Sequence, residues 1–317
     1  MGTAVAQVIA LNGYKVKLWN HSGDLEPLKQ IKEKNENINY LSGVKLSKNI
    51  IPEHSIAEAV DKVGIIFISV PSRFIKSVMS QAAPHLSGRE ICVDISKGFD
   101  EEDLCLTTDV LKGILPKNKI ATVSGPAIAR QMAQGNFTAM NVASADPGAI
   151  RLIKKVMENK NLKLVPTDDI VGVETAGSFK NVYAIAMGIC DGLQIATNTK
   201  AVLFVVAMQE IGLVAKKMGG QMETVYGLAG LGDLIGTGLA TASRNRKLGE
   251  FLAQGRSLSQ AKTEVGQVVE GVSAAKVLNS LSKKFKLKTP LADTIYSIIC
   301  GKISPKIGME NFLKNLK

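Results

Sequence analysis

Short apolar runs alternate with helix-like segments through the first half of the chain, and this alternation restricts the fold more than any other feature. Runs typical of strands occupy residues 15–19, 64–70, 90–95, 119–124, 137–143 and 161–166. The run GIIFISV at 64–70 is apolar at most positions, as in a strand covered on both faces. Strands that alternate with helices predict a doubly wound, mainly parallel sheet.

The pattern changes after about residue 167, where strand signals nearly vanish. From there we expect helices over residues 170–192, 200–218, 222–231, 246–254, 258–264, 270–285 and 290–301. The sequence therefore predicts an α/β domain over residues 1–167 and an all-α domain over residues 168–317. At 317 residues the chain can bury a core without disulfide or metal staples.

The first predicted element is a helix over residues 2–12, although a Rossmann-type dinucleotide-binding unit begins with a strand and a glycine-rich turn. Gly2 occupies the place of the third glycine of a Gly-x-Gly-x-x-Gly fingerprint, but a small residue at a helix start is also a common packing feature. If the unit is real, its first strand and first two glycines are missing, and we interpret Met1 as an internal methionine or the chain as truncated. Such a chain should have two unpaired strand edges, low stability and weak binding of a cofactor pyrophosphate.

The net charge of +11 comes from 39 Lys and Arg against 28 Asp and Glu, and it suits an anionic partner. The lysine-rich segment 283–288 is more typical of a solvated helix end than of a nucleic-acid site, and aromatic residues make up only 5%, with no stacking platform. We therefore expect a small phosphorylated substrate and no nucleic acid.

Cysteine and histidine usage excludes several classes of site. None of the four cysteines forms a Cys-x-x-Cys pair and the three histidines are scattered, which predicts neither a disulfide framework nor a metal centre. The longest apolar stretches, 182–190 and 201–208, are shorter than the roughly 20 residues that span a bilayer. With no signal peptide recognisable, we expect a cytoplasmic protein without membrane insertion.

The end of the 15–19 strand bears on the choice of nucleotide. NAD-selective units carry Asp or Glu there to bind the ribose hydroxyls, whereas this chain has Trp-Asn-His-Ser at residues 19–22. No acid repels a 2′-phosphate, and His21 could approach one, so either NAD or NADP is allowed. A solvated turn explains the same residues equally well.

Polar motifs follow two of the predicted strands, at the carboxyl ends where open α/β sheets bind ligands. They are ISKGF at residues 95–99 and SGPAIA at residues 124–129, so Lys97 can face the crevice. Lys180 lies inside the predicted helix 170–192 among apolar and small neighbours. This lysine is either a surface residue whose stem packs on the helix or a buried functional group.

Three further motifs lie in the helical half, namely GLGDL at 230–234, SRNR at 243–246 and GQVVEG at 266–271. The first ends a predicted helix with one carboxylate. The SRNR cluster suits a phosphate, because the fork of donors on Arg matches phosphate oxygens. It is equally typical of a polar N-cap followed by an exposed helical turn.

Together these motifs resemble those of bacterial NAD(P)-dependent glycerol-3-phosphate dehydrogenases, in order and approximate spacing over essentially the whole chain. The motifs that carry the resemblance are SKGF, SGPAIA, AGSFKNVYAIAMG, GLGDL, SRNR and GQVVEG. The resemblance implies an oxidoreductase that interconverts sn-glycerol 3-phosphate and dihydroxyacetone phosphate with NAD(P)(H). Its product would supply glycerophospholipid synthesis. The resemblance is also compatible with a homodimer.

The resemblance also implies residue roles. Lys180 would be the catalytic proton carrier, with Lys97 and Asp233 beside it. Substrate contacts are implied at Lys97, Gly125, Ala127, Lys180, Asp233, Ser243, Arg244 and Asn245. Cofactor contacts are implied at Lys97, Ala129, Arg244, Val268 and Glu270, and the sequence pattern adds Gly2 and His21. The chain departs from the family at its missing first strand, at Ala127 in place of a common hydroxyl residue, and at Arg130 in place of a frequent Lys.

Two other functions remain open. A two-domain dehydrogenase acting on hydroxy acids would need a carboxylate site, against which SRNR and GQVVEG argue. A non-catalytic binding protein on the same fold would account for the missing fingerprint, but it has no reason to keep Lys97, Lys180, Asp233 and Arg244.

Overall fold

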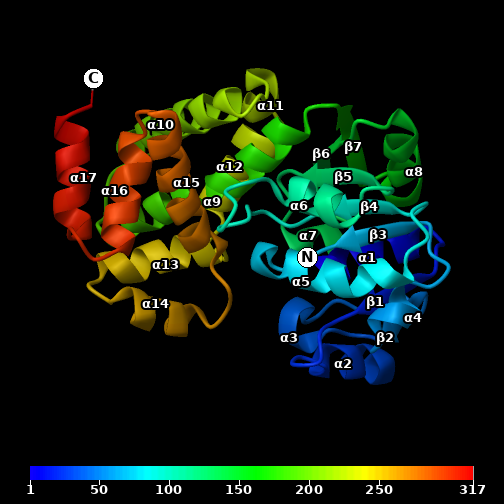
Figure 1. Cartoon of the computed structure of the whole chain (residues 1–317). Helices are drawn as coiled ribbons and strands as arrows, with labels where there is room; N and C mark the ends of the chain where they lie inside the picture. Colours follow the sequence, from blue (N-terminus) through cyan, green and yellow to red (C-terminus); the bar gives the residue numbers. More distant parts are fainter. Residues whose placement is uncertain (317) are drawn as a thin grey trace.

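The computed structural model describes residues 1–316 and places a sheet-containing part beside a helical part (Figure 1). The strands are β1 Val16–Trp19, β2 Ile50–Glu53, β3 Ile65–Ile68, β4 Ile91–Asp94, β5 Lys119–Ser124, β6 Thr138–Ala143 and β7 Leu162–Thr167. The helices between them are α1 Gly2–Leu11, α2 Glu26–Lys34, α3 Ile38–Leu41, α4 Ile56–Val60, α5 Ser72–Ala82, α6 Thr107–Ile114, α7 Ala129–Ala133 and α8 Pro147–Met157, with a 3-10 turn at Ala83–His85.

The helical part follows β7. It comprises α9 Ile170–Gly192, α10 Thr197–Lys217, α11 Met222–Tyr226, a π turn at Leu228–Gly232, α12 Asp233–Leu239, α13 Arg244–Ala253, α14 Leu258–Val265, α15 Glu270–Phe285, α16 Pro290–Ile299 and α17 Pro305–Lys314. The predicted order, a Rossmann-type α/β part followed by an all-α part, is confirmed.

The sheet is mainly parallel, as predicted, but it is divided. Five strands pair in the order β3-β4-β5-β6-β7, with only the β5–β6 pair antiparallel, while β1 and β2 form a separate parallel pair. Within residues 1–316, β1 therefore pairs only with β2, and β3 only with β4. The two unpaired edges expected from the missing first strand are present, and the expected low stability remains a prediction.

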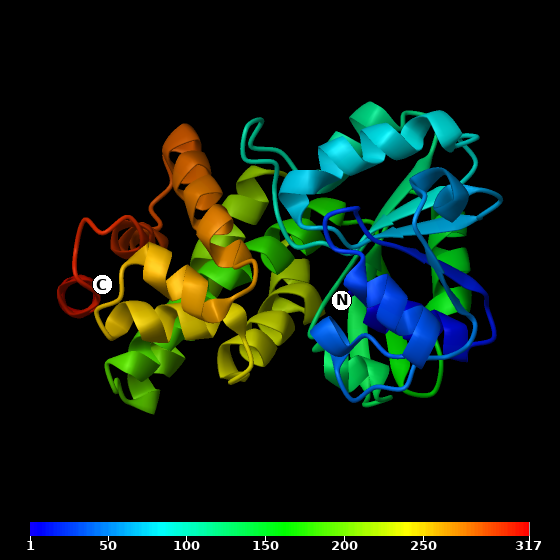
Figure 2. The same ribbon diagram turned by 90° about the horizontal axis from the view of Figure 1, so that it is seen from below.

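Helices cover both faces of the sheet, which makes it doubly wound. One apolar cluster joins α1 and α8 to the inner strands, and a second joins α5 and α6 to their opposite face. Figure 2 shows α1 and α5 on opposite sides of the strands. The carboxyl ends of β4 and β5 point toward the helical part, which brings the loops after them to the boundary.

Several local expectations were wrong. Strand β2 was not predicted, because its four residues include Pro52, which a strand tolerates only at an edge or start. The expected helix 222–231 ends at Tyr226 and is followed by the π turn, so GLGDL does not end a helix: Asp233 opens α12. Helix α17, with its cap at Ser304, was also missed.

Helix α9 is the central element of the helical part, and it is buried on nearly every side. Helix α13 crosses it so closely that a Cβ on Gly188 would lie 1.8 Å from the carbonyl oxygen of Arg246. A Cβ on Gly249 would lie 2.1 Å from the carbonyl oxygen of Ile185. Only glycine permits this approach at either position.

The expectation that no segment could span a bilayer needs correction. Helix α10 is 21 residues long and, by length and composition alone, apolar enough to cross a membrane. In the structure it packs on α9 and buries Leu203, Ala207 and Ile211 in the core of the helical part. This packing accounts for the apolar residues on the side of α10 that faces the core.

Candidate active site

Two lysines from different parts of the fold meet at one carboxylate. The Lys180 ammonium donates to Asp233 Oδ1 at 2.6 Å, and the Lys97 ammonium donates to Asp233 Oδ2. Lys97 comes from the loop after β4, Lys180 from the middle of α9, and Asp233 from the first turn of α12. The structure therefore assembles, at the boundary of the two parts, three residues that are far apart in the sequence.

Burial sets the electrostatics of this cluster. Lys180 is 4% exposed and Asp233 is 2% exposed. Removal from water lowers the pKa of Lys180 to about 7, with Lys97 acting in the same direction and Asp233 opposing it. The surface position considered for Lys180 is thus wrong, and its amine can change protonation state near neutral pH.

The loops that carry Lys97 and Gly125 are in contact. Lys97 also donates to the carbonyl oxygen of Gly125, at 3.1 Å. A Cβ on Gly125 would lie 2.8 Å from Met140 Cα, so a larger residue would displace this carbonyl. Gly125 thus helps to direct the Lys97 side chain toward Asp233.

Thr237 is a member of this cluster that sequence reasoning missed. Its hydroxyl contacts the Lys180 amine and lies 3.3 Å from Asp233 Oδ1. It follows Asp233 by four residues on α12, and residues at that spacing share a helix face. That spacing was the available signal.

The four residues of SRNR have different surroundings. Ser243 caps α13 by accepting from the amide of Arg246, at 3.3 Å. Arg246 donates to Asp191 at 2.5 Å, so its charge is already paired. Arg244 is exposed and forms no ion pair within residues 1–316. Arg244 is therefore the guanidinium of the motif that is free to bind an anion.

Asn245 is buried and ties three helices together. Its amide nitrogen donates to Asn181 Oδ1 at 2.9 Å, and its oxygen accepts from the Gly271 amide at 2.9 Å. Asn181 is the neighbour of Lys180 on α9. Asn245 thus holds α13 and α15 against the helix that carries the buried amine.

Two of the predicted cofactor residues, Gly2 and Lys97, lie near the carboxyl ends of the strands. A narrow crevice contains Met1 and the side chains of Lys97, Ser124 and Ala127, next to the start of α1. A Cβ on Gly2 would lie 3.0 Å from the Ser69 hydroxyl, so the start of α1 lies against the loop after β3.

The remaining predicted contacts are more dispersed. Ala129 is half-buried at the start of α7, and Val268 is 36% exposed in the loop before α15. His21 is exposed after β1, where its ring accepts from the Gly23 amide. Burial raises the pKa of Glu270, while the charges of Arg244 and Arg73 act in the opposite direction. The Arg130 guanidinium donates to the Ser42 carbonyl and does not join the lysine cluster.

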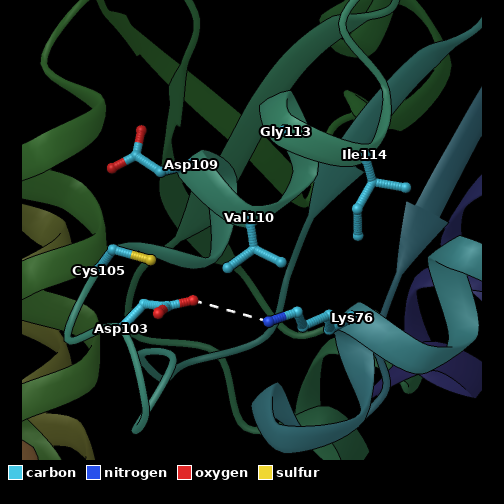
Figure 3. Close-up of a pocket in the computed structure, with 7 residues that line it drawn as sticks. All are labelled: Lys76, Asp103, Cys105, Asp109, Val110, Gly113 and Ile114. Atoms are coloured by element: carbon cyan, nitrogen blue, oxygen red, sulfur yellow. Dashed lines mark ion pairs between the residues drawn. The ribbon is translucent and has the colours of Figure 1, made fainter.

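A surface hollow of about 310 Å³ lies elsewhere, between α5 and α6 (Figure 3). It is lined by Cys105 and by the exposed ion pair Lys76–Asp103, whose charged atoms are 3.6 Å apart. Burial and nearby aspartates raise the pKa of the Cys105 thiol to about 11, so it is not a ready nucleophile. None of the predicted site residues lines this hollow.

A doubly wound domain joined to a helical domain, with a buried amine at their boundary, defines the class of two-domain nicotinamide-dependent dehydrogenases. Residues 1–150 match the family described as NAD-dependent glycerol-3-phosphate dehydrogenase N-terminus, and residues 169–310 match the corresponding C-terminus. The chain belongs to the NAD-dependent glycerol-3-phosphate dehydrogenase family.

Individual relatives agree with this assignment. The chain is 36% identical to a glycerol-3-phosphate dehydrogenase [NAD(P)+] of Bacillus licheniformis, over 100% of this chain and 92% of that protein. It is 35% identical to the enzyme of the same name from Clostridium tetani, over 94% and 85% of the two chains. The crystal structure of glycerol-3-phosphate dehydrogenase from Coxiella burnetii superposes with a TM-score of 0.95 at 29% identity, covering 99% of this chain and 95% of that one.

Proposed function

We propose that this chain interconverts sn-glycerol 3-phosphate and dihydroxyacetone phosphate with NAD or NADP. The observation that carries the proposal is the buried Lys180 amine, held by Asp233 beside Lys97 in the fold of this family. The reaction needs a proton donor for the ketone oxygen in one direction and an acceptor for the alcohol proton in the other. An amine whose pKa is about 7 can serve in both.

The residues present fit part of a dinucleotide site at the edge of the sheet, and the weak pyrophosphate binding expected without the first two glycines remains a prediction. The start of α1 supplies free backbone amides, and the small side chains of Ala127 and Ala129 leave room for a ligand to approach the backbone. Arg244, Val268 and Glu270 would hold the cofactor from the helical side. When bound, the nicotinamide supplies or accepts the hydride.

The protein's own groups then act on the proton and on charge. Negative charge develops on the ketone oxygen during reduction, and protonated Lys180 donates to it. Asp233 orients the Lys180 amine, and Lys97 supplies a second positive charge at the site. During oxidation, neutral Lys180 accepts the proton from the alcohol.

Substrate selection would rest on Arg244. As the SRNR guanidinium that forms no ion pair within residues 1–316, it can pair with the phosphate of the substrate. Asn245, fixed between α9 and α15, would hold Arg244 at a constant position relative to Lys180. Binding at the phosphate then aligns the distant carbon that reacts.

The direct test is reduction of dihydroxyacetone phosphate by the purified chain with NADH and with NADPH, followed as loss of nicotinamide absorbance. Parallel assays with 2-keto acids test the hydroxy-acid alternative, which would be favoured if only those compounds were reduced. Binding of dihydroxyacetone phosphate with no turnover with either cofactor would favour the binding-protein alternative. Comparison of the two cofactors also decides their order of preference.

We further propose that the chain acts in the cytoplasm as a homodimer and supplies glycerophospholipid synthesis, without binding nucleic acid or entering the membrane. The four cysteines are unpaired, which suits a reducing compartment. Exposed Val202, Val205 and Leu213 on α10 provide an apolar surface that a second copy could cover. Light scattering of the purified protein tests the dimer, since a monomer's mass at micromolar concentration would reject it.

A further inference from the structure

Two buried acids lie on the segments that carry the two lysines and have no role in the proton chemistry described above. Asp94 is the last residue of β4 and fully buried, and Glu174 on α9 is 5% exposed. Asp94 precedes Lys97 by three residues, and Glu174 precedes Lys180 by six. Each acid therefore lies on the same segment as one of the two lysines.

The two carboxyl groups share one hydroxyl group. Thr107 Oγ1 contacts both Asp94 Oδ2 and Glu174 Oε1, the latter at 2.8 Å. A hydroxyl group has a single hydrogen and can donate to only one of these oxygens. The other contact requires a proton on a carboxyl group, which then donates to Thr107 Oγ1. The geometry thus places one proton on the acid pair.

Each carboxyl group accepts a further hydrogen bond on its other oxygen, and burial and charge distinguish the two acids. Asp94 Oδ1 accepts from the Ser96 amide at 2.8 Å, and Glu174 Oε2 accepts from the Thr108 hydroxyl at 2.7 Å. Burial raises the pKa of both acids, and the Asp94 charge raises that of Glu174 further. Glu174 is therefore the protonated member, donating to Thr107, which donates to Asp94.

These hydrogen bonds join both ends of the loop that carries Lys97 to helix α9. Asp94 and Thr107 are the residues on either side of loop 95–106, and Thr107 contacts both Asp94 and Glu174. Within the loop, Phe99 pairs with Leu106, and its ring stacks on Phe179 of α9 with centroids 4.8 Å apart. Phe179 directly precedes Lys180. The loop is thus attached to α9 at two places.

We propose that Asp94, Thr107 and Glu174 hold a single shared proton and form a positioning device that fixes the Lys97 loop against the helix carrying Lys180. A shared proton leaves one buried negative charge instead of two. It also makes the contact directional, because Thr107 Oγ1 accepts from Glu174 and donates to Asp94. Loss of this contact would let Lys97 move away from Asp233.

Infrared spectroscopy tests the shared proton directly. The difference spectrum between the wild-type protein and Glu174→Gln at neutral pH should show the carbonyl band of a protonated carboxyl group. The same band should be lost in Asp94→Asn, because the amide then donates to Thr107 and Glu174 becomes ionised. Absence of the band from both difference spectra would overturn the proposal, and either variant suffices if the other fails to fold.

Kinetics test the positioning role. Glu174→Gln can donate and accept at the same places, so its turnover should stay within about threefold of wild type. Glu174→Ala should lower turnover by about 10- to 100-fold, because misplacement near the reacting atoms is costly, with a smaller change in KM. Normal turnover in Glu174→Ala, together with a lower melting temperature, would overturn the positioning role. Equally low turnover in Glu174→Ala and Glu174→Gln would also overturn it.

The turnover measurements rest on the proposed function, and the infrared measurement does not. A wild-type protein that shows the band but does not reduce dihydroxyacetone phosphate would reject the proposed function and leave the shared proton standing. A Glu223→Gln variant, altered at an exposed position on α11, is the matched control for both measurements.

Discussion

The amine of Lys180 lies 2.6 Å from Asp233 Oδ1, although 53 residues separate them in the sequence. One residue comes from the middle of a buried helix, and the other opens a helix after a π turn. Lys97 occupies the second oxygen of the same carboxylate. The single negative charge of Asp233 therefore orients two cations, and burial leaves one of them able to lose its proton.

Replacing Lys180 by alanine should remove the proton carrier. We expect turnover with dihydroxyacetone phosphate to fall by about two to four orders of magnitude, the usual contribution of general acid catalysis. Lys262→Ala, at an exposed position on α14, is the matched control and should keep wild-type turnover. Near-normal turnover in Lys180→Ala would reject the role.

Turnover should change with pH in opposite senses for ketone reduction and for alcohol oxidation. Ketone reduction needs protonated Lys180, so its turnover should fall as pH rises through about 7. Alcohol oxidation needs the neutral amine, so its turnover should rise through the same range. Turnover measured as a function of pH in both reaction directions checks this. Turnover that rises with pH in both directions, or falls in both, would contradict it.

Replacing Asp233 by asparagine keeps the size of the side chain and removes its charge. Since the Asp233 charge raises the pKa of Lys180, its loss should lower that pKa further. The decline of ketone reduction should therefore move to lower pH, and maximal turnover should decrease as orientation is lost. A decline that stays at the wild-type pH would show that Asp233 does not act on Lys180 electrostatically.

The two arginines of SRNR should behave differently. Arg244→Ala should raise the KM for dihydroxyacetone phosphate by about 10- to 100-fold, the equivalent of one charge-assisted hydrogen bond, with a smaller effect on kcat. Arg246→Ala should instead lower the free energy of unfolding by about 1.5–3 kcal/mol, because Asp191 loses one of its two cationic partners and keeps only Lys200. Steady-state kinetics and urea unfolding of both variants check the contrast, and an unchanged KM in Arg244→Ala would contradict the phosphate role.

Glu210 should be important for stability. Its carboxyl group accepts from the Leu291 and Ala292 amides at the start of α16 and from the Tyr183 hydroxyl. Glu210→Ala leaves these buried donors without an acceptor, at a cost of about 1–3 kcal/mol for each. Urea unfolding measures the loss, with exposed Glu223→Ala as the control, and equal stability of the two variants would be the contrary result.

Sequence reasoning succeeded where a property depends on local pattern. The alternation of strands and helices and the change after about residue 167 follow from hydrophobic periodicity, and the structure confirms the resulting fold class. It failed at β2, where four residues with a proline give too short a signal, and at the π turn, which no periodicity predicts. The two unpaired strand edges were also predicted from the sequence, and the divided sheet has them.

The sequence by itself determined which chemical groups the protein has and on which elements most of them lie, because side-chain periodicity and motifs are local. Only the tertiary structure decided which groups meet. It buried Lys180, shared Asp233 between two lysines, paired Arg246 while leaving Arg244 free, and brought Asp94 and Glu174 to one hydroxyl. Desolvation and proton sharing depend on neighbours that are distant in the chain, so their consequences follow from packing and not from any one segment.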